Sequence, residues 1–391
     1  MRIVSIEDLH CDAGWRVWSF LKVTTDEGVV GWAEYNESYG SRGLTAVIRK
    51  LAEPLIGHDP RPVERITAML YARTRQAPGG LIQQAIAAIE NALVDVKARA
   101  LGVPVAELLG GPMRARLRLY WSHCGSYRVS HADAMGKPPV RSLDDLRALA
   151  REVRESGFTA LKTNIFGFDQ GAPAMLQPGF ARNPGWPELN VDRRLLRAIA
   201  DQMAAFREGA GDEVDLLLDL NFNFKTEGFL EVARAIEPFD LMWLEIDSYD
   251  PQALGLIRRI SGTPVASCES LFGRRQFRPF LDVQAVDVAI VDVPWNGILE
   301  GMKIAAMCEA YEVNCAPHNF YGHLSTMMSA HFCAAIPNFR IMEIDIDDVP
   351  WKDELVGPPP VIEAGHLVLP PAPGWGVEVN EAAIRAHPPK G

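Results

Sequence analysis

The feature that most constrains the fold is a regular alternation, beginning near residue 117, of short apolar runs with amphipathic helical segments. The apolar runs are LRLYWSH, TALKTN, VDLLLDL, LMWLEI, PVASCE, VDVAIVD, VNCAPH and RIMEIDI. The predicted helices lie near 142–156, 191–208, 226–237, 250–260, 273–282, 298–309 and 322–335. Continuous apolar strands that alternate with helices are typical of parallel strands buried on both faces. Eight such strands predict a barrel whose last strand lacks a strong helix behind it.

The regions before and after this alternation have other patterns. Three β-patterned runs, RIVSIEDLH, VWSFLKVTT and VVGWAEY, precede helical stretches near 42–56, 61–76 and 79–101, which predicts an α+β domain. We therefore divide the chain into an α+β domain over 1–115, a barrel over 116–364 and a Pro-rich segment over 365–391 that returns to the first domain. Residues 165–190 form the longest insertion and are a lid or loop candidate.

Composition excludes several classes of protein. The chain has 391 residues and a net charge of −11, from 50 acids against 39 bases, which argues against nucleic-acid binding. Its six cysteines form no CxxC pair, so we expect buried free thiols in a reducing compartment. The N-terminus does not resemble a signal peptide and no apolar run approaches the length of a membrane span. We expect a cytoplasmic protein, and a homo-oligomer because symmetric assembly is common.

Ionisable residues stand at the ends of the predicted barrel strands, one in each successive β/α unit. They are Lys162, Asp219, Glu245, Glu269, Asp292, His318 and Glu343, and from Asp219 onward they are separated by 26, 24, 23, 26 and 25 residues. Each alone fits a helix cap, a snorkelling lysine or a structural histidine. Together they would converge at the mouth of a barrel, where burial is costly unless they pair or bind a metal.

The pattern predicts a chemistry for this mouth. Asp219, Glu245 and Glu269 would repel one another without a cation, and hard oxygen ligands favour Mg²⁺. Asp292 and His318 lie on neighbouring strands and can form a dyad in which the carboxylate fixes the imidazole tautomer. Glu343, if its pKa were raised, could donate a hydrogen bond as a neutral acid.

Several segments resemble the enolase superfamily, in its mandelate racemase branch. They are ALGVPVAELLGG at the domain junction, LKTN on strand 2, DLN, LEI and CES at the metal-ligand positions, DVPWNGILEG, APHNFYGHLS and PGWGVEV. The resemblance implies a modified TIM barrel, (β/α)₇β, with an N-terminal α+β capping domain and access shaped by loops near 11–20 and 37–43. It also implies a Mg²⁺ cofactor and a Lys or His base, as in other members of that superfamily.

Two departures from the family pattern bear on the reaction. Asn164 replaces the second lysine of the strand-2 motif, and an amide cannot be the second base of a racemase. The Lys-x-Asn version resembles acid-sugar dehydratases of the galactonate type. In those enzymes a histidine that protonates the departing hydroxyl stands where this chain has Asn221. After strand 4 the usual Glu-Glu-Pro reads Glu245, Ile246 and Asp247.

The expected function is Mg²⁺-dependent dehydration of a small acid sugar, with no nucleic acid or membrane as partner. His318 would remove the α-proton, and Mg²⁺, Lys162 and Glu343 would stabilise the enediolate. The leaving β-hydroxyl could take its proton from His318, as rhamnonate-type dehydratases do, or from His123, which is otherwise a plain loop histidine.

Other interpretations stay open. They are a one-base epimerase or cycloisomerase of the same superfamily, a Schiff-base aldolase that uses Lys162, and a non-catalytic barrel that binds sugar acids. We place Asn164, Asn221, His123 and Trp15 at the substrate. Aromatic residues near the entrance could stack on the substrate or pack in the core; they are Trp15, Trp18, Tyr39, Trp121 and Trp295.

Overall fold

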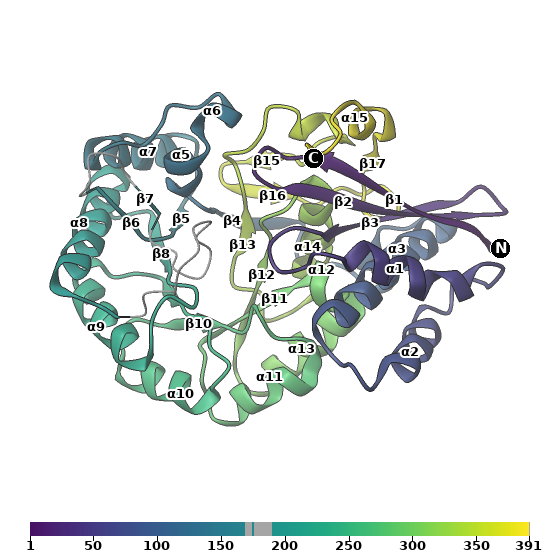
Figure 1. Ribbon diagram of the computed structural model, residues 1–391, viewed down its shortest axis with the longest axis horizontal. Helices are drawn as coiled ribbons and strands as arrows, with labels where there is room; N and C mark the ends of the chain where they lie inside the picture. The colour runs from purple at the N-terminus through teal and green to yellow at the C-terminus, as the bar shows by residue number, and fades with distance from the viewer. Residues whose placement is uncertain (169–173, 176–189, 391) are drawn as a thin grey trace.

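The computed structural model describes residues 1–168, 174–175 and 190–390, and Figure 1 shows an N-terminal sheet with helices packed beside a larger α/β barrel domain. This is the predicted class, a modified TIM barrel of the (β/α)₇β type with an α+β capping domain. No helix of the described residues is both long and apolar enough to span a bilayer.

The N-terminal unit is an antiparallel sheet covered by helices. Its strands pair in the order β1-β2-β3. They are β1 (Ile3–Asp12), β2 (Val17–Thr25) and β3 (Val30–Asn36), followed by the helices α1 (Leu44–Ala52), α2 (Val63–Thr74) and α3 (Gly80–Leu101). A Cβ at Gly31 would lie 2.5 Å from the carbonyl oxygen of Ala92, so glycine is required where β3 approaches α3.

The barrel strands are parallel and follow the chain in order. They are β4 (Arg116–Trp121), β5 (Ala160–Thr163), β8 (Asp215–Asp219), β9 (Trp243–Glu245), β10 (Val265–Ser267), β11 (Val288–Asp292), β12 (Asn314–His318) and β13 (Met342–Ile344). Each strand from β4 to β12 pairs with the next, and β13 pairs with β4. A parallel bridge between Cys315 and Phe339 joins β12 to the segment that leads into β13.

Seven helices of the described residues connect these strands. They lie outside the strands (Figure 1). They are α7 (Leu143–Glu155), α8 (Arg193–Ala210), α9 (Thr226–Ile236), α10 (Pro251–Ile260), α11 (Gly273–Asp282), α13 (Ile298–Ala310) and α14 (His323–Ala335). Three begin at a side-chain cap, because Ser142, Asp192 and Asp250 accept hydrogen bonds from backbone N–H groups of the first turn. Every helix lies where the apolar spacing predicted it.

Two cores hold the barrel domain. A large one lies between strands and helices, and a small one fills the barrel interior. In the interior, Tyr120 and Trp243 pack edge to face with ring centroids 5.8 Å apart. Trp243 Nε1 donates a hydrogen bond of 3.2 Å to Glu245, and Lys162 Nζ lies 5.3 Å from the Tyr120 ring centre. The aromatic core is therefore the floor beneath the charged residues.

The C-terminal segment contacts both units. β16 (His366–Val368) pairs antiparallel with β4 and with β15 (Ile362–Glu363), and β14 (Val356–Gly357) pairs with β17 (Glu378–Val379) before α15 (Glu381–Ala386). Trp375 Nε1 donates a 2.7 Å hydrogen bond to the Trp32 carbonyl, and Arg99 forms a 2.5 Å ion pair with Glu378.

Short elements complete the described fold. They are α4 (Val105–Leu108), α5 (Ser126–Ser130), α6 (Ala132–Met135), α12 (Val293–Asn296), β6 (Phe166–Gly167) and β7 (Ala174–Met175). The last two belong to the predicted insertion over 165–190, of which 169–173 and 176–189 lie outside the described residues.

Candidate active site

A cavity of about 740 Å³ lies over the carboxyl ends of the barrel strands. Barrel residues line most of it, and Trp15 and the loop around Tyr39 of the N-terminal unit complete its wall. These are the two loops from which we predicted that access would be shaped. Among the aromatic candidates, Trp295 also lines the cavity, whereas Trp18 and Trp121 are fully buried core residues.

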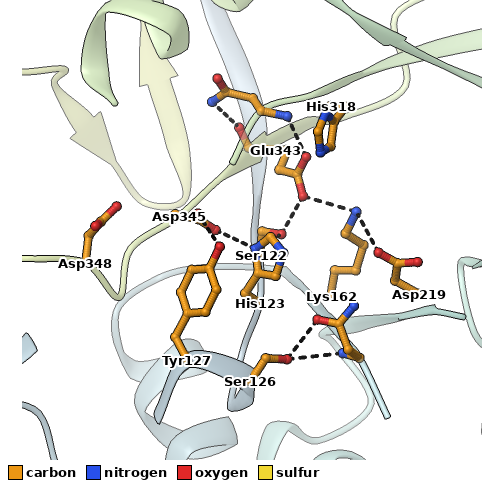
Figure 2. A network of polar contacts seen from close by, with 12 residues as sticks. Ser122, His123, Ser126, Tyr127, Lys162, Asp219, His318, Glu343, Asp345 and Asp348 are labelled. Atoms are coloured by element: carbon orange, nitrogen blue, oxygen red, sulfur yellow. Dashed lines mark hydrogen bonds and ion pairs between the residues drawn. The ribbon is translucent and has the colours of Figure 1, made fainter. Parts of the chain in front are cut away.

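Lys162 is the centre of a buried ionic cluster at the base of this cavity (Figure 2). Its Nζ lies 2.9 Å from Glu245 Oε2, 3.1 Å from Glu343 Oε1 and 3.9 Å from Asp219 Oδ2. Burial lowers the pKa of Lys162, but the surrounding carboxylates outweigh it and hold the pKa well above its ordinary value. The ammonium is therefore charged, and the neutral amine that a Schiff base requires is disfavoured.

The three proposed metal ligands approach one another on neighbouring strands. Asp219 and Glu245 are paired in register, and Glu269 follows β10, the next strand. Burial raises the pKa of all three; Asp219 adds to the rise at Glu245, and both add to the rise at Glu269. Such mutual repulsion in a buried site is the condition that a cation relieves.

The donor set fits a hard divalent cation. Glu245 Oε1 is buried and has no hydrogen-bond partner, which leaves one carboxylate oxygen available for coordination. Within the described residues, no three His, Cys, Asp or Glu side chains already stand at metal-binding positions. Lys162 instead pairs with Glu245 and, at 3.9 Å, with Asp219, and His318 pairs with Glu269. Anionic oxygen donors that accept cationic partners are the ligands that Mg²⁺ prefers.

His318 and Asp292 form the predicted dyad at the ends of β12 and β11. Nδ1 of His318 lies 2.6 Å from Asp292 Oδ2, which also accepts a 2.6 Å hydrogen bond from the Tyr321 hydroxyl. Burial lowers the pKa of His318, but Glu269, 3.4 Å from Nε2, and Asp292 raise it to about 10. A cation beside Glu269 would cancel part of that carboxylate's charge and move the imidazole toward the neutral base.

Glu343 differs from the neutral acid that we expected. Burial raises the pKa of Glu343, but the positive charges of Lys162, His318 and His123 outweigh burial and lower the pKa to about 2. It accepts hydrogen bonds from the Ser122 hydroxyl and from the backbone N–H of Asn319, the latter at 2.6 Å. Lys162 supplies the counter-charge that the sequence argument had not assigned to Glu343, so the residue is an ionised acceptor in this arrangement.

The residues predicted at the substrate all line the cavity: Trp15, His123, Asn164 and Asn221. Asn164 Oδ1 accepts a 2.9 Å hydrogen bond from Ser126, and its Nδ2 lies 3.4 Å from Asn221 Oδ1. The backbone N–H of Asn221 donates to Asp219 Oδ1 at 2.8 Å. The two amides thus form a polar edge next to the carboxylate cluster.

The sequence did not predict a place in the site for four residues: Arg16, Tyr321, Asp345 and Asp247. Asp247 lines the cavity. Asp345 pairs with His123 at 2.8 Å, and the buried Arg16 reaches Asp345 from the β1–β2 connection. A signal existed for Asp345, because it follows Glu343 by two residues in an alternating strand. No feature of the sequence indicated that Arg16 contacts the barrel.

Comparison with known proteins agrees with this architecture. Residues 15–110 match the mandelate racemase / muconate lactonizing enzyme N-terminal domain, and residues 145–383 match the enolase C-terminal domain-like family. A D-xylonate dehydratase of Haloferax volcanii is 30% identical over 95% of this chain and 85% of its own length. A D-galactonate dehydratase of Ralstonia nicotianae is 30% identical over 94% of this chain and 90% of its own.

A solved structure from Burkholderia xenovorans strain LB400, provisionally named an L-alanine-DL-glutamate epimerase, is 52% identical. The comparison has a TM-score of 0.98 and covers 100% of this chain and 99% of the other chain. A second structure of that name, 53% identical with a TM-score of 0.97 over 100% of this chain and 96% of its own, is bound to magnesium and fumarate. Members of the superfamily use Mg²⁺ with a Lys or His base. The chain belongs to the enolase superfamily, with the capping and barrel domains of its mandelate racemase and muconate lactonizing enzyme members.

Proposed function

We propose that this protein is a Mg²⁺-dependent hydro-lyase that converts an acid sugar into a 2-keto-3-deoxy acid and water. The observation that carries the proposal is the buried His318–Asp292 dyad, which lies beside the cluster of Lys162 and three carboxylates at the base of the cavity. A base next to an ammonium group and to carboxylates that could hold a divalent cation is what α-proton removal from a carboxylate substrate requires.

The roles follow from the contacts of each residue. Asp219, Glu245 and Glu269 would hold Mg²⁺, which supplies positive charge for the developing enediolate. His318 takes the α-proton at Nε2, since Nδ1 is engaged by Asp292. The Lys162 ammonium stabilises the enediolate oxygens, and Glu343 fixes Lys162 at 3.1 Å. Asn164, Asn221 and Trp15 bind the hydroxylated remainder of the substrate.

The relatives support dehydration as the reaction. Two of them, each covered over at least 85% of its length, are named dehydratases of D-xylonate and D-galactonate. Both names describe monocarboxylic sugar acids, and the cavity of this chain offers hydrogen-bonding amides beside an aromatic wall. These features fit a substrate with one carboxylate and several hydroxyl groups.

An epimerase of the same superfamily is the second candidate, and the name of the 52% identical structure favours it. Epimerisation needs the α-proton to return to the other face of the carbon. Asn164 stands where a second lysine would serve that purpose, and an amide does not exchange protons as a base does. A one-base epimerase is therefore the form that this site permits.

A substrate screen in D₂O separates the candidates. The purified protein with Mg²⁺ is incubated with D-xylonate, D-galactonate, D-gluconate and a wider library of mono- and diacid sugars. Formation of a 2-keto acid supports dehydration. Deuterium incorporation with inversion at the α-carbon and no keto acid supports epimerisation. Binding by calorimetry without exchange or product across the library would support a non-catalytic sugar-acid barrel and contradict the proposal.

A further inference from the structure

A second histidine–aspartate pair lies at the same cavity, outside the roles assigned above (Figure 2). His123 follows β4 and has a positive φ of 47°, in the left-handed region that non-glycine residues adopt uncommonly. Its ring lines the cavity and stacks on Tyr127, with centroids 4.5 Å apart and planes 8° from parallel. The stacking on Tyr127 and the contact with Asp345 thus hold the imidazole at the cavity.

Asp345 determines which ring nitrogen of His123 is available. Oδ1 of Asp345 lies 2.8 Å from His123 Nδ1, while Oδ2 accepts from the Tyr127 hydroxyl at 3.2 Å and faces Arg16 at 3.4 Å. Burial raises the pKa of Asp345, but His123, Arg16 and Lys352 bring it to about 2. An ionised Asp345 accepts the Nδ1 proton of His123, and Nε2 has no partner among the described residues.

The pair is also joined to the ionic cluster. Ser122 Oγ lies 3.2 Å from His123 Nδ1 and donates a hydrogen bond to Glu343, which contacts Lys162. His123 follows β4, Glu343 lies on β13 and His318 ends β12, so the three residues stand at neighbouring strands of the barrel. A substrate whose α-carbon lies beside His318 has its next carbons within the same cavity that His123 lines.

We infer that His123, oriented by Asp345, is the general acid that protonates the departing β-hydroxyl. The inference rests on the proposed dehydration, which needs such a donor because Asn221 has no acidic proton to give. His318 takes the α-proton, and the electron pair left on C2 forms the C2=C3 bond as the C3–O bond breaks. His123 Nε2 gives its proton to that oxygen, which leaves as water. The enol then takes a solvent proton at C3 and releases its C2 hydroxyl proton to solvent, which gives the 2-keto acid.

The test compares two leaving groups. On the acid sugar that the screen identifies, H123N should lose dehydration by about 10²- to 10⁴-fold, the contribution typical of a general acid. Exchange of the α-proton with D₂O should continue, because His318 is intact. On the 3-deoxy-3-fluoro analogue, H123N should stay within about tenfold of the unaltered protein, because fluoride leaves without a proton. H123Q is measured in parallel as a second variant.

The control is H10N, which removes a histidine–aspartate pair, His10 with Asp8 at 3.1 Å, from the β1–β2 sheet outside the cavity. It should leave both eliminations unchanged. The acid role is overturned if H123N and H123Q dehydrate the hydroxyl substrate normally, or if fluoride elimination falls equally. Loss of folded protein in both variants would make His123 a stability residue and overturn it as well. If the unaltered protein forms no 2-keto acid, the proposed function itself fails, a result distinct from any of these.

Discussion

The two histidine–aspartate pairs at the cavity have similar geometry but different surroundings. Asp292 contacts His318 at 2.6 Å, and its other partners are the neutral Tyr321 hydroxyl and Trp295 N–H. Asp345 contacts His123 at 2.8 Å but also faces the Arg16 guanidinium. Burial raises the pKa of Asp292, whereas cationic neighbours lower that of Asp345 to about 2.

The difference teaches that two similar pairs can hold aspartates whose pKa values are shifted in opposite directions, and that the second pair has a third partner, the Arg16 guanidinium. Among the described residues, His318 is the one cationic partner of Asp292, which suits a base that must attract a proton. Asp345 contacts the Arg16 guanidinium as well as His123. The predictions below test this contrast.

The largest effect is expected at His318. Replacing it with asparagine should lower turnover by about 10³- to 10⁴-fold, because no other group takes the α-proton. Exchange of the substrate α-proton with D₂O, measured by NMR, should be lost to the same extent. H123N is the matched variant, since it should keep exchange. Persistent exchange in H318N would show that the base is another residue.

Arg16→Met should have the largest effect on stability. It leaves Asp345 and Asp348 buried with less counter-charge, and breaking a buried ion pair costs about 3–5 kcal/mol. The fall in unfolding free energy is measured by denaturant titration. The control is R49M, which removes an exposed pair with Asp8 and should cost less than about 1 kcal/mol. Equal losses in the two variants would contradict the role of Arg16 as the buried counter-charge.

Asp292→Asn should lower turnover by about 10²-fold, through a weaker base with an unfixed tautomer. Exchange should fall in parallel with dehydration, unlike in H123N. The variant keeps an oxygen that can accept from Tyr321, so the protein should remain folded. An unchanged exchange rate, measured at the same pH, would show that Asp292 does not set the basicity of His318.

Much of the fold could be predicted because its signals are local. The apolar spacing predicted α11 at 273–282, where the structure has Gly273–Asp282, and placed the other six barrel helices with small shifts. The strands β14 to β17 were missed as ordered pairs because two or three residues carry no periodic signal. Their pairing depends on tertiary contacts that no short window contains.

The site, like the fold, has features that could be predicted from the sequence and features that could not. The ionisable residues at the strand ends could be found by counting. Five of the seven line one cavity, and the other two, Glu245 and Asp292, contact Lys162 and His318. Their roles stay predictions. The ionised state of Glu343 could not be found, because it depends on Lys162 being 3.1 Å away. Arg16 was hidden for a similar reason: it is 329 residues from Asp345 along the chain.

The smallest effect, and the finest test of the contrast, is Tyr127→Phe. The Tyr127 hydroxyl accepts a 2.9 Å hydrogen bond from Arg16 and donates one of 3.2 Å to Asp345, so it ties the third partner to the carboxylate. Phenylalanine keeps the ring that stacks on His123, and only the hydroxyl is lost. Stability should fall by about 1 kcal/mol, the net worth of such bonds. Arg16 and Asp345 remain charged and close, so dehydration should fall less than about tenfold and exchange should not change. A loss of dehydration as large as that of H123N would mean that the hydroxyl, rather than the Arg16 charge, distinguishes the second pair from the first.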